Sequence, residues 1–237
     1  MKFSIIIPLY NEAGRLPKTA GTIFDFFKAQ PDEIEIIFVN DGSTDNTLEV
    51  LWSYQDLHQF KIVSYAPNRG KGYAVKQGAL SATGDWLIFF DIDLATPLAE
   101  FINLKNTMAP GDQIIIGSRR LENSQIQKSE SSLRTFLGQG FTKISNILVP
   151  GIKDFTCGFK CFSKEAAQKI FSVARIDRWG FDTELLYIAK LKKIPVKQMP
   201  VAWRHDDDSR VKVFKAVFGS LKELWQMKMN QLKGLYK

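Results

Sequence analysis

The hydrophobic positions of this chain fall into short apolar runs, separated by stretches in which apolar residues recur at every third or fourth position. Short runs rich in β-branched and aromatic residues predict buried strands, and the wider spacing predicts helices. In the first half we expect strands at 3–9, 34–39, 61–65 and 86–93, and helices at 16–29, 44–57 and 73–81. This alternation of strand and helix predicts right-handed βαβ units and a parallel sheet.

The second half shows the same two periodicities less regularly. Strands are expected at 113–117, 154–162 and 196–203, helices at 134–149, 164–173 and 183–192, and a polar loop at 121–131. No internal repeat or linker separates these segments. We therefore expect one α/β domain over residues 1–210, with a central, mostly parallel sheet flanked by helices, and a basic amphipathic helix over 211–237.

Polar turns follow each of the first four strands. They read Tyr10-Asn11-Glu12, Asp41-Gly42-Ser43, Asn68-Arg69-Gly70 and Asp91-Ile92-Asp93. The carboxyl ends of parallel strands lie at one edge of a sheet, and open α/β sheets bind their ligands there. We therefore expect the four turns to meet in one binding site. Ser43 or Thr44 is also expected to cap the helix that follows.

Asp91 and Asp93 are the first candidates for chemistry. Side chains at positions i and i+2 of a strand point the same way, so the two carboxylates are expected side by side. Neighbouring carboxylates repel each other unless a cation lies between them, and hard divalent cations prefer oxygen ligands. The pair predicts a Mg²⁺ or Mn²⁺ site completed by substrate phosphates. The alternative is an acidic turn that only ends a strand.

Composition and charge narrow the choice of partners. The chain has 237 residues, of which 45% are hydrophobic and 24% charged, and this argues against disorder. Its net charge of +7 favours an anionic partner, such as nucleic acid, a membrane surface or a phosphorylated small molecule. Nucleic acid is the least favoured, because the basic residues are dispersed outside the C-terminal segment and no aromatic-basic recognition motif appears.

Membrane spans, a signal peptide and a zinc site are not expected. Met1-Lys2 leads straight into a strand, and no apolar run approaches the roughly 18 residues of a transmembrane helix. Cys157 and Cys161 have no second pair of ligands, so free thiols in a reducing compartment are expected. The protein should be soluble or peripheral.

The C-terminal segment combines an apolar stripe with many basic residues. The stripe, at the spacing of one helix face, comprises Phe214, Val217, Phe218, Leu221, Leu224 and Trp225. The basic residues are opposed by a single acid, Glu223. A helix of this kind either lies on an anionic bilayer or packs on the domain with its basic face in water, and the pattern leaves both open.

The motifs, taken together, resemble the family 2 glycosyltransferases of the GT-A fold. Those of the first half are Ile6-Ile7-Pro8-Leu9-Tyr10-Asn11-Glu12, Val39-Asn40-Asp41-Gly42-Ser43-Thr44-Asp45, Asn68-Arg69-Gly70-Lys71-Gly72 and Asp91-Ile92-Asp93. Those of the second half resemble the branch that transfers sugars to polyprenyl phosphates, the dolichyl-phosphate mannose synthases and glucosyltransferases. They are Gly117-Ser118-Arg119, Asp154-Phe155-Thr156-Cys157-Gly158-Phe159-Lys160, Arg178-Trp179-Gly180-Phe181-Asp182, Trp203-Arg204 and Ser209-Arg210-Val211.

The resemblance implies a nucleotide-sugar half over about 1–118 and an acceptor half over about 119–210. The residues implied to contact the nucleotide are Pro8, Tyr10, Glu12, Asp41, Asn68, Lys71 and Ile92. Within that set, Asp41 would bind the base. Asp91 and Asp93 would act through the metal, which neutralises charge on the departing diphosphate.

An acceptor phosphate is already anionic and needs positioning, which suits the bidentate hydrogen bonds of arginine. The candidates for binding the acceptor or the diphosphate are Arg119, Arg134, Arg204, Arg210 and Lys212. Arg119, which follows a strand ending in Gly-Ser, and Arg210, in Asp-Ser-Arg-Val, are the best placed, and Arg119 is also the catalytic candidate.

These features predict an inverting, metal-dependent hexosyltransferase that acts on a polyprenyl phosphate at the cytoplasmic membrane face. The C-terminal helix or a separate membrane protein would hold it there. UDP-glucose is favoured over GDP-mannose, because 154–160 and 179–184 are closer to the glucosyl branch. Ala95 stands where mannose synthases often carry Gln, which implies fewer protein ligands for the metal or a different donor base or sugar. Two alternatives are a glycan hydroxyl acceptor, with Asp182 or Glu184 as general base, and a protein that binds sugar nucleotides without turnover.

Overall fold

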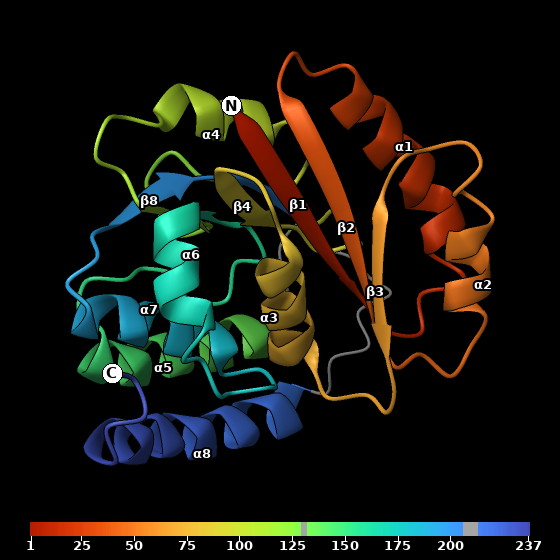
Figure 1. Ribbon diagram of the computed structural model, residues 1–237. Helices are drawn as coiled ribbons and strands as arrows, with labels where there is room; N and C mark the ends of the chain where they lie inside the picture. The colour runs from red at the N-terminus through yellow and green to blue at the C-terminus, as the bar shows by residue number, and fades with distance from the viewer. Residues whose placement is uncertain (129–131, 206–212) are drawn as a thin grey trace.

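The computed structural model describes residues 1–128, 132–205 and 213–237, and its centre is a seven-stranded sheet (Figure 1). The strands are β1 (Lys2–Leu9), β2 (Glu33–Asp41), β3 (Lys61–Tyr65), β4 (Trp86–Phe89), β5 (Ile114–Ser118), β7 (Lys160–Ser163) and β8 (Val196–Pro200). Their order is β3-β2-β1-β4-β7-β5-β8. Strand β7 runs antiparallel to β4 and β5, and the other pairs are parallel. The expected mostly parallel sheet is confirmed.

Helices cover both faces of the sheet (Figure 1). They are α1 (Leu16–Lys28), α2 (Thr47–Trp52), α3 (Lys71–Ser81), α4 (Glu100–Thr107), α5 (Ser132–Leu148), α6 (Lys164–Phe171), α7 (Phe181–Leu191) and α8 (Val213–Leu232). Strand β1 contributes side chains to the core on both faces of the sheet, because side chains alternate along a strand. Ile5 and Ile7 join the core layer under α1 and α4, whereas Ile6 joins the layer under α3, α6 and α7.

The acidic turn begins only after its strand has ended. Strand β4 stops at Phe89, and Asp91 and Asp93 lie in a tight turn in which the Leu94 N–H donates to the Asp91 carbonyl at 3.1 Å. Leu94 has a left-handed φ of 51°. The expectation that the two acids extend from the strand itself is therefore wrong, although they still follow its carboxyl end.

The helix after β2 is shorter than the sequence predicts. Helix α2 has Asn46 as its N-cap residue, with no side-chain cap. The Ser43 hydroxyl and the Thr44 N–H hydrogen-bond instead to Asn11, in the loop after β1. The predicted capping by Ser43 or Thr44 is wrong, because the Ser43 hydroxyl and the Thr44 N–H are hydrogen-bonded to the loop after β1.

A second, small sheet takes up residues 125–128 of the predicted loop at 121–131 and the end of the predicted strand at 196–203. Strand β6 (Gln125–Lys128) pairs in parallel with β9 (Ala202–Arg204). Val201 joins the two sheets: its N–H donates to the Ser118 carbonyl at 3.3 Å, and its carbonyl accepts from the Gln125 N–H at 3.1 Å. Residues 125–128 therefore form a strand instead of a loop, and the predicted strand at 196–203 is divided into β8 and β9. The division occurs because the chain passes from one sheet to the other at Val201.

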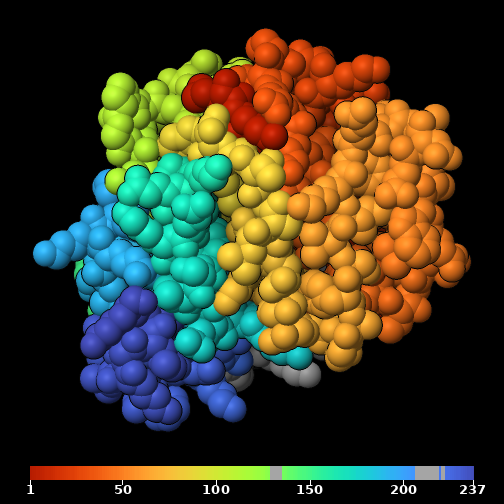
Figure 2. Space-filling view, in the orientation of Figure 1, coloured from red at the N-terminus to blue at the C-terminus, as the bar shows by residue number. Residues whose placement is uncertain are grey.

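The C-terminal helix α8 packs against α5 and α7, and Figure 2 shows it on the outside of the molecule. Leu224 and Met227 are buried, whereas Trp225 is 67% exposed. The expectation that Leu224 and Trp225 lie on one face is wrong, since successive residues of a helix point about 100° apart. In the part of the chain that the structure describes, no helix combines the length and the hydropathy needed to cross a bilayer.

Candidate active site

The loops that follow β1 and β2 are locked together at one edge of the sheet. Asn11 has a left-handed φ of 56°, and its N–H donates to the Ser43 hydroxyl at 3.0 Å. Its side-chain carbonyl accepts from the Thr44 N–H at 2.8 Å, and the Glu12 N–H donates to the Thr47 hydroxyl at 2.7 Å. The predicted meeting of the first two turns is confirmed.

Asp41 organises the turn after β3. Its buried carboxylate accepts from the Asn68 side-chain amide at 2.6 Å and from the N–H groups of Arg69 and Gly70, both at 2.8 Å. These three donors fix the turn that leads into α3 and so place Lys71 in the first turn of that helix. The structure brings the predicted nucleotide ligands Asp41 and Asn68 together. The predicted bond from Asp41 to a base stays a prediction.

Lys71 joins this turn to the acidic turn, because its Nζ lies 2.5 Å from Asp91 Oδ1. Burial by itself lowers the pKa of Lys71, but the carboxylates of Asp91, Asp182 and Asp93 raise it above its ordinary value. Burial also raises the pKa of Asp93, and the charge of Asp91 raises it further. The two carboxylates therefore lie close enough to repel each other, and a lysine partly balances their charge.

Lys160 supplies a second, fully buried cation that the sequence prediction missed. Its ammonium pairs with Asp182 in the first turn of α7 and donates to the Cys157 carbonyl at 2.6 Å. Burial raises the pKa of Asp182, although Lys160 and Lys71 act in the opposite direction. A lysine inside the apolar run Cys-Gly-Phe-Lys-Cys-Phe was the available signal, because lysine is almost never buried unless paired.

Arg119 is held by a buried carboxylate. Its Nε donates to Asp154 Oδ2 at 2.7 Å, and its Nη2 donates to Asp154 Oδ1 at 2.9 Å and to Thr156 Oγ1 at 2.8 Å. The same loop lies against the acidic turn, since a Cβ added to Gly158 would meet Asp91 Oδ2 at 2.0 Å. Arg119 thus braces a loop whose backbone contacts Asp91.

The remaining nucleotide candidates lie at or near the same edge with different exposure. Tyr10 is exposed, Pro8 is half-buried, and the Glu12 carboxylate accepts from the Arg15 guanidinium at 2.6 Å. The Ile92 side chain is buried in the core layer under α1 and α4. It serves packing, so a contact between Ile92 and a nucleotide would have to come from its backbone.

The acceptor candidates are described only in part. Arg204 is exposed, and its N–H donates to the Ala95 carbonyl at 2.8 Å, which places β9 beside the acidic turn. Arg134 lies in α5, but its side chain is outside the described part of the structure. Arg210 and Lys212 lie outside the described residues altogether.

Glu184, one of the two candidate bases, is fully buried and hydrogen-bonded within the fold. Its carboxylate accepts from the N–H groups of Arg175 at 2.9 Å and Ile176 at 2.8 Å, and from the Tyr236 hydroxyl at 2.6 Å. Asp182, the other candidate, is paired with a lysine. Both candidate bases are therefore already paired within the fold.

The acidic turn fits a hard divalent cation. Asp91 and Asp93 offer carboxylate oxygens, and Asp91 already binds a positive group, the ammonium of Lys71. Within the described residues, no group of three or more His, Cys, Asp or Glu side chains is arranged to hold a metal. A cation at the two acids would complete its coordination with substrate oxygens or water, as Mg²⁺ does at phosphate sites.

The family model described as "Glycosyl transferase family 2" matches residues 4–171, which is more than half of the chain. The chain belongs to glycosyl transferase family 2. The matched range contains all four turns described above, together with Arg119 and Lys160. The family and the enzyme class expected from the resemblance are confirmed.

This glycosyltransferase is similar to two dolichyl-phosphate beta-glucosyltransferases over almost its whole length. It is 35% identical to the protein from Dictyostelium discoideum over 248 residues, which span 99% of this chain and 76% of that protein. It is 33% identical to the protein from Homo sapiens over 252 residues, which span 100% of this chain and 78% of that protein.

Among solved structures, the chain resembles glucosyl-3-phosphoglycerate synthase from Mycobacterium tuberculosis in complex with Mn²⁺, UDP and glucosyl-3-phosphoglycerate. The TM-score is 0.69 at 16% identity, and the match covers 95% of this chain and 79% of that one. At this identity the likeness shows the fold alone. The GT-A fold expected from the sequence is confirmed.

Proposed function

We propose that this enzyme transfers glucose from UDP-glucose to a dolichyl or other polyprenyl phosphate. The proposal is carried by the identity with two dolichyl-phosphate beta-glucosyltransferases, which extends beyond the nucleotide motifs to the acceptor half. The structurally similar synthase holds UDP with Mn²⁺, and this supports a uridine nucleotide and a divalent metal as the donor-site ligands.

Asp91 and Asp93 would hold the Mg²⁺ or Mn²⁺ ion. When bound, the ion supplies positive charge to the diphosphate as the glycosidic bond breaks. The ammonium of Lys71, now 2.5 Å from Asp91, would donate to the same leaving group. Lys71 is held in place by the turn that Asp41 fixes, so its charge is oriented before the reaction begins.

The nucleoside would lie over the locked loops after β1 and β2. Tyr10 is exposed there and offers an aromatic face, and Pro8 and Glu12 are its neighbours. Asp41 would receive a hydrogen bond from the base, in addition to those from the turn after β3. Its position at the end of β2 supports this role.

A phosphate acceptor suits the protein groups at the site. An acceptor phosphate is already anionic near neutral pH, so it needs no general base, and attack opposite the diphosphate inverts the anomeric carbon. The pairing of Asp182 with Lys160 and of Glu184 with Tyr236 favours such an acceptor over a hydroxyl. We assign the acceptor phosphate to Arg119 and Arg204. The Arg204 N–H donates to the Ala95 carbonyl next to the acidic turn, and the Arg119 guanidinium lies 5.2 Å from the ring of the neighbouring Trp203.

The sequence adds Arg134, Arg210 and Lys212 to this assignment. Because the acceptor is a lipid, the enzyme would work at the cytoplasmic face of a membrane. Trp225 and Leu232 are exposed on α8, which supports peripheral contact through this helix. A separate membrane protein remains the alternative means of attachment.

The test is transfer from labelled nucleotide sugars with the purified enzyme, a divalent metal and short polyprenyl phosphates. We expect a lipid-linked glucose product from UDP-glucose that disappears on chelation of the metal. The matched control is the corresponding polyprenol, which lacks the phosphate and should receive no sugar. Transfer to the polyprenol, or no product with any common nucleotide sugar, would contradict the proposal.

A further inference from the structure

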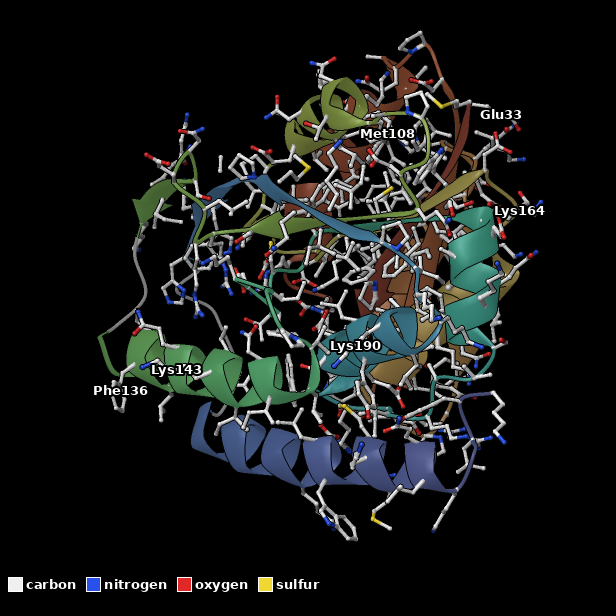
Figure 3. The ribbon with its side chains drawn as sticks, turned by 90° about the vertical axis from the view of Figure 1, so that its left-hand side faces the viewer. Glu33, Met108, Phe136, Lys143, Lys164 and Lys190 are labelled. Carbon is white, nitrogen blue, oxygen red and sulfur yellow. The ribbon has the colours of Figure 1, made fainter. Side chains whose placement is uncertain are left out.

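The connection between α6 and α7 (residues 172–180) lies against the first turn of α3, the turn that carries Lys71. Figure 1 shows α3 beside α6 and α7, and Figure 3 shows α6 and α7 from another side, with Lys190 of α7 labelled. Helix α3 has no side-chain cap. Instead the Tyr73 N–H, one of the donors that a helix start leaves without an intrahelical partner, donates to the Asp177 carbonyl at 3.0 Å. The α6–α7 connection therefore caps the helix that presents the lysine.

The contact is close because two glycines of α3 and its cap face the α6–α7 connection. A Cβ added to Gly70 would meet the Asp177 carbonyl oxygen at 2.6 Å. A Cβ added to Gly72 would meet the Ile176 carbonyl oxygen at 2.6 Å and the Phe181 Cβ at 2.5 Å. A larger residue at either position would push the α6–α7 connection away from the helix. The glycines on both sides of the lysine thus let two carbonyls approach the helix backbone.

Side chains add to this contact from the same direction. The Arg69 guanidinium pairs with the Asp177 carboxylate at 3.0 Å and lies over the Tyr73 ring, 3.6 Å from its centroid. The Lys76 ammonium, one turn further along α3, donates to the Ala174 carbonyl at 2.6 Å. The Arg69 pair is partly exposed, and such pairs contribute about 1 kcal/mol or less. The alignment of α3 therefore depends chiefly on the main-chain contact and the packing at the glycines.

Glu184 fixes the opposite side of the α6–α7 connection. It is fully buried in α7, and its carboxylate accepts from the Arg175 N–H at 2.9 Å and from the Ile176 N–H at 2.8 Å. The Tyr236 hydroxyl donates to the same carboxylate at 2.6 Å. Hydrogen bonds to an ionised acceptor are roughly twice as strong as neutral ones, so this carboxylate is a firm anchor. The α6–α7 connection is thus held by Glu184 through its N–H groups and meets α3 through its carbonyls.

We propose that Glu184 is a positioning residue for sugar transfer. It holds the α6–α7 connection against the first turn of α3, and this fixes the ammonium of Lys71 beside Asp91, where the diphosphate would bind. The inference rests on the proposed role of Lys71 at the leaving group, and it gives Glu184 a part in the reaction that involves no proton transfer. Since charge on the diphosphate grows as the glycosidic bond breaks, a misplaced Lys71 should lower kcat more than it raises KM for the nucleotide sugar.

The first test compares Glu184→Ala with Glu184→Gln in transfer to a short polyprenyl phosphate, using the nucleotide sugar that supports the reaction. Glutamine keeps one oxygen that can accept from the N–H groups of the α6–α7 connection. We therefore expect kcat to fall at least about tenfold in Glu184→Ala and about threefold or less in Glu184→Gln. A general base would give equal losses, because neither side chain can take up a proton. Equal losses of kcat in the two variants would overturn the proposal.

A second variant makes the test independent of the stability of Glu184→Ala. Gly72→Ala should push the α6–α7 connection away from α3 while Glu184 stays in place. Its matched control, Gly21→Ala, adds the same methyl group to α1, where no atom lies within 4 Å, and brings the same gain in helix propensity. We expect kcat to fall at least about tenfold in Gly72→Ala and to stay within about twofold in the control. A kcat for Gly72→Ala as high as that of the control would overturn the proposal.

A double-mutant cycle with Lys71→Ala shows whether the α6–α7 connection acts through this lysine. Once Lys71 has been removed, Gly72→Ala should lower kcat by only about twofold or less. A loss as large as in the wild-type background would overturn the inference, because the α6–α7 connection would then act on another group. An unchanged rate in Lys71→Ala alone would instead overturn the proposed role of Lys71 at the leaving group, and this inference with it.

Discussion

Replacing Asp154 by asparagine should destabilise the protein strongly. The carboxylate is fully buried and accepts from the Arg119 side chain at 2.7 and 2.9 Å and from the Arg119 N–H at 3.1 Å. Removing one partner of a buried ion pair costs about 3–5 kcal/mol, because the other charge is left uncompensated. At about 2–4 °C per kcal/mol for a chain of this size, the Tm should fall by roughly 6–20 °C.

The assay is thermal unfolding followed by calorimetry and circular dichroism, and the control is Asp112→Asn. Asp112 also pairs with a cation, Lys197 at 2.9 Å, but both side chains are partly exposed, so its loss should cost about 1 kcal/mol or less. A double-mutant cycle with Arg119→Ala, which removes the other charge, isolates the pair itself. If the Tm of Asp154→Asn stays as close to the wild type as that of the control, the reasoning is refuted.

The same pair predicts a dependence of stability on pH. Burial alone would raise the pKa of Asp154, but the Arg119 guanidinium holds it well below its usual range. A carboxyl with a depressed folded-state pKa contributes its full stability above the unfolded value, near about pH 4, and loses it as the pH falls toward the folded value. The wild type should therefore lose stability below about pH 4 more steeply than Asp154→Asn. Parallel curves would contradict this.

Tyr236→Phe removes the hydroxyl that donates to the buried Glu184 at 2.6 Å and should cost about 1.5–3 kcal/mol in urea unfolding; an unchanged midpoint would contradict the assigned bond. Asp93→Asn should remove the stabilisation that Mn²⁺ with UDP gives in a thermal-shift assay, and retention of that shift would rule out a metal at the acidic turn. Glu223→Ala removes the carboxylate that accepts from the Gly180 N–H at 2.7 Å, and it should slow sugar transfer about five- to tenfold. Glu223→Gln keeps an acceptor at that position and should restore most of the rate. Equal losses of rate in the two variants would argue against a positioning role for Glu223.

The first half of the fold could be predicted because its signals are local. Apolar strands and helical spacing are read within windows of ten or so residues. The turn residues that close each βα unit, such as Asn11 and Asp41, stand next to the strands they follow. The position of four polar turns at one edge then follows from parallel pairing alone.

The elements that the sequence prediction missed are stabilised by contacts with residues far away in the chain. Strand β6 was not predicted, because its four residues are exposed and acquire their strand conformation only from pairing with β9. Helix α4 was not predicted, because its buried residues include Glu100, whose carboxylate accepts from the Ala202 N–H. The signal for β6 therefore lies outside its own local sequence.

The contacts that the site residues make with one another were likewise not predictable from the local sequence. Arg119 was identified from its position after a strand, but the sequence does not say that Asp154 would hold its guanidinium. The pairing of Lys160 with Asp182 likewise joins a strand to a helix 22 positions later. Motifs revealed which residues gather at the site, whereas the charge balance among them required the three-dimensional arrangement.

The C-terminal helix and the residues that follow it are attached to the α7 region by three side-chain hydrogen bonds. These bonds join Glu223 to Gly180, Gln231 to Tyr187, and Tyr236 to Glu184. Gly180 is the N-cap residue of α7, and the first turn of that helix carries Asp182, the carboxylate that pairs with Lys160. A force on the last helix, from a bilayer or from a fused tag, would therefore act through these hydrogen bonds on α7, the helix that carries Asp182.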